Sequence, residues 1–363
     1  MIYGRWEVIN MTFGGLMMEG LKTLYSYVVE HTLFCLIPAF FIAGAITAFL
    51  NTAAVMRYFG PKTNKFLAYS VASVSGAILA VCSCTVLPIY TGIRVKGAGL
   101  GPAIAFLYSA PAINILAMTY SMNLLGYDLG IARIIGAVSF AFVIGLIMAR
   151  IFHKDEERRV KVAEDAEAFA YDDGSRVRPG YQNLVYFGVL IAILVYGTAK
   201  MPTIIKYAGE ILLVALLIYL VHRWFTREEV KTWFSETWHM VKLILPVLLI
   251  GVFLVGVVKE LIASDVIARY VGGNTIGGNA IASVSGALMY FATLTEVPIV
   301  KGLLELGMGR GPALALMLAG PALSLPSMIV LTRIMGFKKA GTYILLVCIF
   351  AMCTGYVFGM FAK

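Results

Sequence analysis

Two cysteines separated by a single residue, Cys82 and Cys84, are the side chains with the sharpest chemical character in this sequence. Thiolates favour soft, thiophilic partners such as trivalent arsenic or Cu(I) over hard cations. On a regular helix the two thiols would lie on opposed faces, so a shared ligand requires unwound backbone, which the nearby Pro88 favours. The alternative, left open here, is that both cysteines are small packing residues.

A carboxylate, Glu296, lies in a similarly apolar stretch, two residues before Pro298. Carboxylates at membrane depth are energetically expensive and usually face a cavity, a partner or a proton path. We expect Glu296 to be protonated in one state and ionised in another, which would couple transport to a proton gradient. The structural alternative is that Lys301, five residues on, neutralises it.

Two mid-span prolines are each followed by a polar residue: Pro111 by Asn114 and Pro321 by Ser324. Such a pair supplies a kink and a group that either satisfies the freed backbone or binds an oxygen-bearing ligand. The predicted substrate site therefore comprises Cys82, Cys84, Thr85, Asn114, Thr295 and Ser324, with Glu296 as the coupling group and helix breaks at Pro88, Pro111, Pro298 and Pro321.

These residues belong to a stretch that occurs twice. Residues 73–117 reappear without a gap as residues 283–327, shifted by 210, and both copies begin Ser-Val-Ser-Gly-Ala. Farther upstream, Arg-Tyr-Phe-Gly at 57–60 matches Arg-Tyr-Val-Gly at 269–272. Apolar segments interrupted by Gly and Pro at corresponding places in two halves are typical of a transporter's binding site.

Composition sets the class of the protein. Of 363 residues, 60% are hydrophobic and only 13% are charged, against about 25% charged in soluble domains. We expect an all-α polytopic membrane protein whose partners are the lipid bilayer and a small-molecule substrate. The net charge of +9 is typical of basic cytoplasmic loops rather than of nucleic-acid binding. Five scattered cysteines indicate no disulfide framework.

The hydropathy pattern divides the chain into five parts. They are an interfacial segment (1–22), a first membrane repeat (23–151), a hydrophilic cytoplasmic linker (152–180), an extra transmembrane pair with its loop (181–235) and a second repeat (236–363). Ten apolar runs reach spanning length, giving about 8–10 transmembrane segments. If one interrupted segment per half is re-entrant, the two halves run in opposite directions; the sequence leaves parallel and inverted repeats open.

The paired blocks, CSCTVLPIYTGIRVKGAGLGPAIAFLYSAPAINILA and TEVPIVKGLLELGMGRGPALALMLAGPALSLPSM, resemble the signatures of a prokaryotic family of predicted permeases. That family includes the ArsP-type organoarsenical efflux permeases. The resemblance implies a multi-pass plasma-membrane permease that exports a small solute, in some members arsenite or a trivalent organoarsenical held by cysteine. The cysteine pair at 82 and 84 matches the family pattern.

Other function classes have less support. The sequence has no Walker motif and no His-Glu-x-x-His, and its four histidines are isolated, so we expect neither an enzyme nor a cofactor or metal site. A permease or channel for another small metabolite, with structural cysteines, remains the alternative. The oligomeric state stays open.

Overall fold

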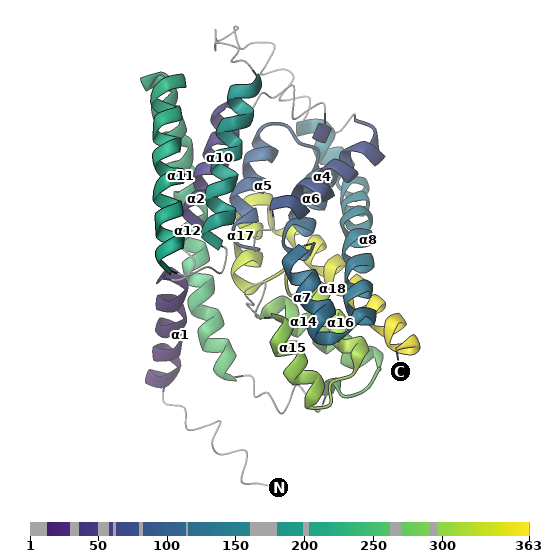
Figure 1. Cartoon of the computed structure of the whole chain (residues 1–363). Coiled ribbons are helices and arrows are strands. Elements are labelled where there is room, and N and C mark those ends of the chain that lie inside the picture. Colours follow the sequence, from purple (N-terminus) through teal and green to yellow (C-terminus); the bar gives the residue numbers. More distant parts are fainter. Residues whose placement is uncertain are drawn as a thin grey trace.

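The computed structural model describes residues 13–29, 36–49, 58–60, 63–79, 83–113, 115–159, 180–198, 203–261, 270–289 and 296–362. The regular structure within these residues is helical (Figure 1), which confirms the predicted fold class. The helices are α1 (Phe13–Tyr27), α2 (Ile37–Phe49), α4 (Lys65–Leu79), α5 (Val86–Val95), α6 (Leu100–Ala112), α7 (Ile115–Leu125), α8 (Tyr127–Ile151), α10 (Gly180–Thr198), α11 (Thr203–Trp224), α12 (Arg227–Leu261), α14 (Ile276–Leu288), α15 (Glu296–Glu305), α16 (Arg310–Ala319), α17 (Leu325–Met335) and α18 (Phe337–Phe361).

Within the described residues, four helical stretches are long and apolar enough to cross a membrane: Tyr127–Ile151, Tyr207–Trp224, Arg227–Leu254 and Phe337–Phe361. The remaining apolar helices are shorter, and among them α6 is followed directly by α7 and α16 by α17. A crossing needs about 20 helical residues, so each of these two pairs forms one interrupted crossing. The protein is a polytopic membrane protein.

Two of the interrupted segments are hairpins that enter and leave on the same side. The backbone N–H of Gly99, just after α5, donates to the Phe59 carbonyl before α4 at 2.7 Å. The N–H of Gly309, just after α15, donates to the Val271 carbonyl before α14 at 2.9 Å. The returning arms of the two hairpins are α5 and α15. Each contains ten residues and is therefore only about 15 Å long. The sequence-based alternative of re-entrant segments therefore matches the structure better than ten full spans.

The helix boundaries recur along the chain. α5, α7 and α8 begin and end 210 residues before α15, α17 and α18, respectively. The described glycines with positive φ also form two such pairs, Gly97 with Gly307 and Gly126 with Gly336. Gly97 and Gly307, with φ of 96° and 98°, form the turn after each hairpin, in a conformation that L side chains rarely adopt. We call α4–α8 the first half and α14–α18 the second half.

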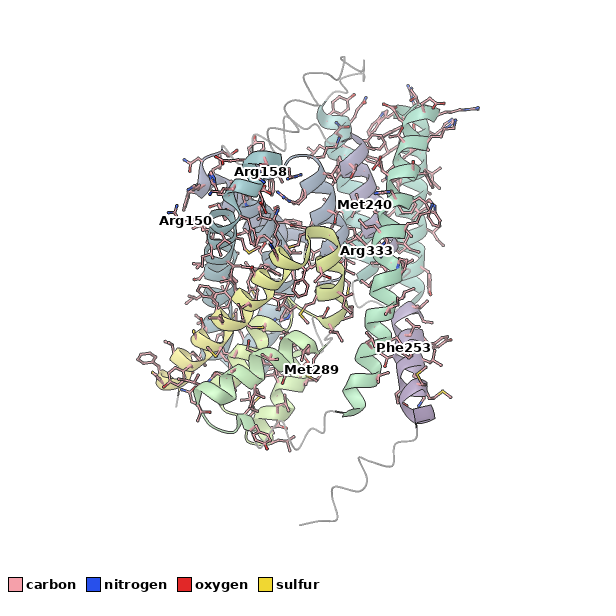
Figure 2. All side chains as sticks on the ribbon, turned by 180° about the vertical axis from the view of Figure 1, so that it is seen from behind. Arg150, Arg158, Met240, Phe253, Met289 and Arg333 are labelled. Carbon is pink, nitrogen blue, oxygen red and sulfur yellow. The ribbon has the colours of Figure 1, made fainter. Side chains whose placement is uncertain are left out.

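The two hairpins lie at opposite ends of the molecule. Figure 1 shows α4 and α5 in its upper part and α14 and α15 in its lower part. The second half packs on the first mainly through α18 and α16 against α8. Figure 2 places Arg150, in the last turn of α8, and Arg158, which follows α8, toward one end of the molecule, and Phe253 of α12 toward the other end. α1 begins at that other end (Figure 1).

A second group of helices flanks these halves. The long helix α12 packs along both α1 and α2, and α10 packs against α2 and α11. Close approach depends on Gly44, where an added Cβ would lie 2.1 Å from the Thr237 hydroxyl. Trp233 of α12 is buried and donates its indole N–H to the Phe41 carbonyl at 2.9 Å. This group contacts the halves through α2 on α5 and α12 on α17.

Candidate substrate site

Helix breaks bring backbone and polar side chains to the inside of the molecule. α6 ends at Ala112, one residue after Pro111, and α16 ends at Ala319, two residues before Pro321. Pro88 and Pro298 lie instead in the first turns of α5 and α15, where a missing N–H removes no intrahelical bond. These breaks and the turn of buried residues 83–85, at the inner end of the first hairpin, supply unwound backbone at buried positions, as transporter sites require.

The inner end of the first hairpin touches the break of the second half. The hydroxyls of Ser83 and Ser324 lie 3.4 Å apart, and both side chains are buried. Ser324 also caps α17: its hydroxyl accepts from the Ser327 N–H at 3.3 Å, and the Ser327 hydroxyl accepts from the Ser324 N–H at 2.9 Å. This reciprocal capping box fixes the start of α17 and holds the Ser324 hydroxyl beside the hairpin.

The inner end of the second hairpin is held by an ion pair. Arg133 Nη2 on α8 donates to Glu296 Oε2, at the start of α15, over 2.8 Å, and each side chain is 1% exposed. Arg133 Nη1 donates to the Ser121 hydroxyl on α7 at 2.9 Å, and that hydroxyl donates to the Ala117 carbonyl at 2.6 Å. Arg133 thus joins α7, α8 and α15, and connects the two halves.

Part of this pair's hydrogen-bonding capacity is unused. Among the described residues, neither Arg133 Nε nor Glu296 Oε1 has a hydrogen-bond partner, although both atoms are buried. Leaving buried polar atoms of charged groups unpaired is unfavourable. Glu296 Oε1 is therefore available to a proton or to a hydrogen-bond donor, and the Arg133 Nε–H is available to an acceptor on a water molecule or a substrate.

The ion pair corrects one expectation from the sequence. Lys301, considered as the neutralising partner of Glu296, is exposed, and the partner is Arg133, 163 residues away. No local spacing could predict this pairing. A signal was present, however, because Arg133 is a charged residue inside the apolar span Tyr127–Ile151, and charges within a membrane usually pair with another group.

The two halves differ chemically at this site. The residues 210 positions from Glu296 and Arg133 are Val86 and Tyr343, so the first hairpin has no corresponding ion pair. At the contact between the halves, the Tyr108 hydroxyl on α6 donates to the Leu318 carbonyl on α16 at 3.0 Å. Tyr108 and Leu318 are themselves 210 residues apart.

The structure describes part of the predicted site. Cys84 and Thr85 are buried, at 0% and 1% exposure, directly after Ser83, and Ser324 contacts this turn. Glu296 begins α15 and pairs with Arg133. Three predicted residues lie outside the described ranges: Cys82, Asn114 and Thr295. Ser83, Arg133 and Ser121 are site residues that the sequence did not single out.

Comparison with known proteins gives the family. The ArsP_1 family, described as "Predicted permease", matches residues 17–360. UPF0718 protein MJ0584 of Methanocaldococcus jannaschii is 42% identical over 355 residues, which cover 94% of this chain and 96% of that protein. UPF0718 protein YcgR of Bacillus subtilis is 28% identical over 134 residues, covering 36% of this chain and 44% of that protein. No solved structure matches. The chain therefore belongs to the predicted permease family, and it is by family a multi-pass membrane transporter.

Proposed function

We propose that this permease is a secondary active transporter that exports a small solute across a prokaryotic plasma membrane. The observation that carries the proposal is the buried Arg133–Glu296 pair, which joins α8 of one half to a hairpin of the other. Ion pairs at membrane depth are expensive and are associated with substrate or proton pathways. Because this ion pair connects the two halves, it can break and re-form as the halves move relative to each other.

We also propose that the two halves arose by duplication and are related by an axis in the membrane plane. Helix boundaries that recur at 210 residues and hairpins at opposite ends support this relation. The hydrogen bond between Tyr108 and Leu318 supports it independently, because equivalent residues meet only near a two-fold axis. Inverted halves of this kind alternate access to a central site by rocking or gating.

Glu296 is the proposed coupling group. Ionised, it holds Arg133 over 2.8 Å. Protonation through the unpaired Oε1 would remove the negative charge, weaken the pair and release α15 from α8. Arg133 would then be free to attract a negatively polarised substrate atom through Nε. One proton would be exchanged for each change of partner.

The proposed substrate is thiophilic, with a trivalent arsenical as the leading candidate. Cys84 is buried at the turn of the first hairpin, beside Ser83, and Cys82 precedes that turn by one residue. Unwound backbone allows two thiols one residue apart to approach one ligand, which a helix does not. The remaining proposed contacts are Thr85, Asn114, Thr295 and Ser324.

Binding of methylarsenite and arsenite to the purified full-length protein tests this substrate class. We expect binding by the wild type, loss in Cys82→Ser/Cys84→Ser, and retention in the control Cys348→Ser/Cys353→Ser, whose thiols lie on α18. Equal binding by all three proteins, or no binding by any, would contradict the thiol site. A permease or channel for another small metabolite, with cysteines that only pack, would then be the better account.

A further inference from the structure

An apolar groove lies outside the candidate substrate site, between α2, α10, α11 and α12. It has a volume of about 1060 Å³ and is lined mainly by aliphatic and aromatic side chains, including Ile193, Val214, Ile218, Phe41 and Phe225. Small-molecule sites typically occupy about 300–1,000 Å³. The groove therefore has room for a ligand larger than a small solute, and its lining is suited to hydrocarbon.

One end of this groove is basic. His222, Arg227 and Lys231 line it around the connection from α11 to α12. Lys231 lies 3.6 Å from Glu228, but both side chains are about four-fifths exposed (78% and 83%), and such a pair is weak. Lys231 thus stays available to an anion.

The acidic lining residue lies elsewhere. Glu210, which is 9% exposed, also borders the groove. It precedes His222 by twelve positions on α11, or about 18 Å at 1.5 Å per residue. The charge distribution is therefore polarised along the groove, with cations gathered at the end next to the helix connection.

This basic end lies where a membrane surface is expected. α11 ends and α12 begins at the same end of the molecule as the start of α10, the helix that follows the hydrophilic linker in the sequence (Figure 1). Basic residues favour the cytoplasmic side, whose leaflet carries anionic lipids. The groove thus extends from the headgroup region into the hydrocarbon.

We propose that the groove binds one anionic phospholipid, with acyl chains along α11 and the phosphate at Arg227, Lys231 and His222. The long apolar walls match the acyl chains of such a lipid, and the cations at one end match its phosphate. A second protein helix in the groove would not require cations at one end. The site is independent of the Arg133–Glu296 pair and of the transported substrate.

Native mass spectrometry of the full-length protein, purified with equimolar phosphatidylglycerol and phosphatidylcholine, tests the proposal. We expect one retained phosphatidylglycerol per chain, in preference to phosphatidylcholine. Arg227→Gln/Lys231→Gln should weaken retention at least tenfold, since each basic residue near the surface contributes about fivefold in affinity. The control Arg223→Gln removes an exposed charge from the same end that does not line the groove, and it should retain the lipid.

A second pair of variants tests the apolar part without changing charge. Ala215→Trp narrows the groove, whereas Leu212→Trp adds the same bulk to an exposed position outside it. Only Ala215→Trp should reduce phosphatidylglycerol retention. Equal retention of both lipids, or equal loss in Arg223→Gln, would overturn the proposal. So would a dimer that Ala215→Trp disrupts, because the occupant would then be a second copy of the chain.

Discussion

Arg133 and Glu296 are bonded over 2.8 Å although they lie in different halves of the chain, and each side chain is 1% exposed. Their counterparts in the opposite halves are Tyr343 and Val86, which are not charged. The protein thus places its buried charge pair at one of two otherwise corresponding positions. This asymmetry gives the second hairpin an electrostatic attachment that the first one does not have.

The ion pair makes a prediction about stability. Removing one charge from a buried pair typically costs about 3–5 kcal/mol, because the other charge stays buried, whereas replacing both is far less harmful. Arg133→Met should therefore lower the thermal unfolding midpoint in detergent more than Arg133→Met/Glu296→Leu does. The control Lys301→Gln, at an exposed position of the same helix, should change the midpoint little. If the changes in midpoint caused by Arg133→Met alone and by Glu296→Leu alone add up to the change in the double variant, a direct interaction is contradicted.

The hairpins make a prediction about sidedness. Val95 ends α5 and is 57% exposed, and Leu306 follows α15 and is 62% exposed. In a background without native cysteines, Val95→Cys and Leu306→Cys should react with a membrane-impermeant maleimide from opposite sides of oriented vesicles. Ten full spans would place both positions on the same side, so labelling from one side only would contradict the re-entrant arrangement.

A third prediction concerns pH. Burial raises the pKa of Glu156, but hydrogen bonds and charge from Arg94, the charge of Arg159 and the Leu100 N–H outweigh burial and lower it overall. A folded-state pKa below the unfolded one gives stability that is present above the unfolded pKa and is lost as pH falls through the folded pKa. The wild type should therefore lose stability in acid more steeply than Glu156→Gln.

Thermal unfolding measured across the acid range provides the test of that third prediction. Glu157→Gln serves as the matched control, because the Glu157 side chain is 60% exposed and its pair with His153 at 3.5 Å lies at the surface. It should follow the wild-type pH profile. If Glu156→Gln and Glu157→Gln behave alike, the Arg94–Glu156 contact does not contribute to the acid sensitivity.

Much of the fold was predictable because Gly and Pro act locally. Pro111 and Pro321 end α6 and α16 within two residues of where the sequence placed the breaks. The match of residues 57–60 with 269–272 corresponds to equivalent hydrogen bonds at Phe59 and Val271. Local sequence patterns do not predict which side chains on different helices lie close together. The partner of Glu296 and the contact of Ser83 with Ser324, 241 residues apart, depend on packing.

The sequence also did not reveal whether an interrupted segment crosses the membrane or returns to the side from which it entered. A run such as residues 67–90 is long and apolar enough to span, and only the hydrogen bond between Gly99 and Phe59 shows that the chain returns to the side it entered. Hydropathy measures the preference of a segment for lipid or protein interior, and it is the same for a hairpin buried among helices and for a span. Two of the ten apolar runs therefore form hairpins, an arrangement that lies within the predicted range of about 8–10 transmembrane segments.

Flux of methylarsenite into proteoliposomes under an imposed pH gradient tests the central claim most directly. The account predicts saturable flux that the gradient accelerates in the wild type, flux without gradient dependence in Glu296→Gln, and no flux above empty vesicles in Cys82→Ser/Cys84→Ser. Glu296→Asp keeps the carboxylate and should keep the gradient dependence. Gradient-dependent flux that persists unchanged in Glu296→Gln would contradict the proposed coupling through the Arg133–Glu296 pair.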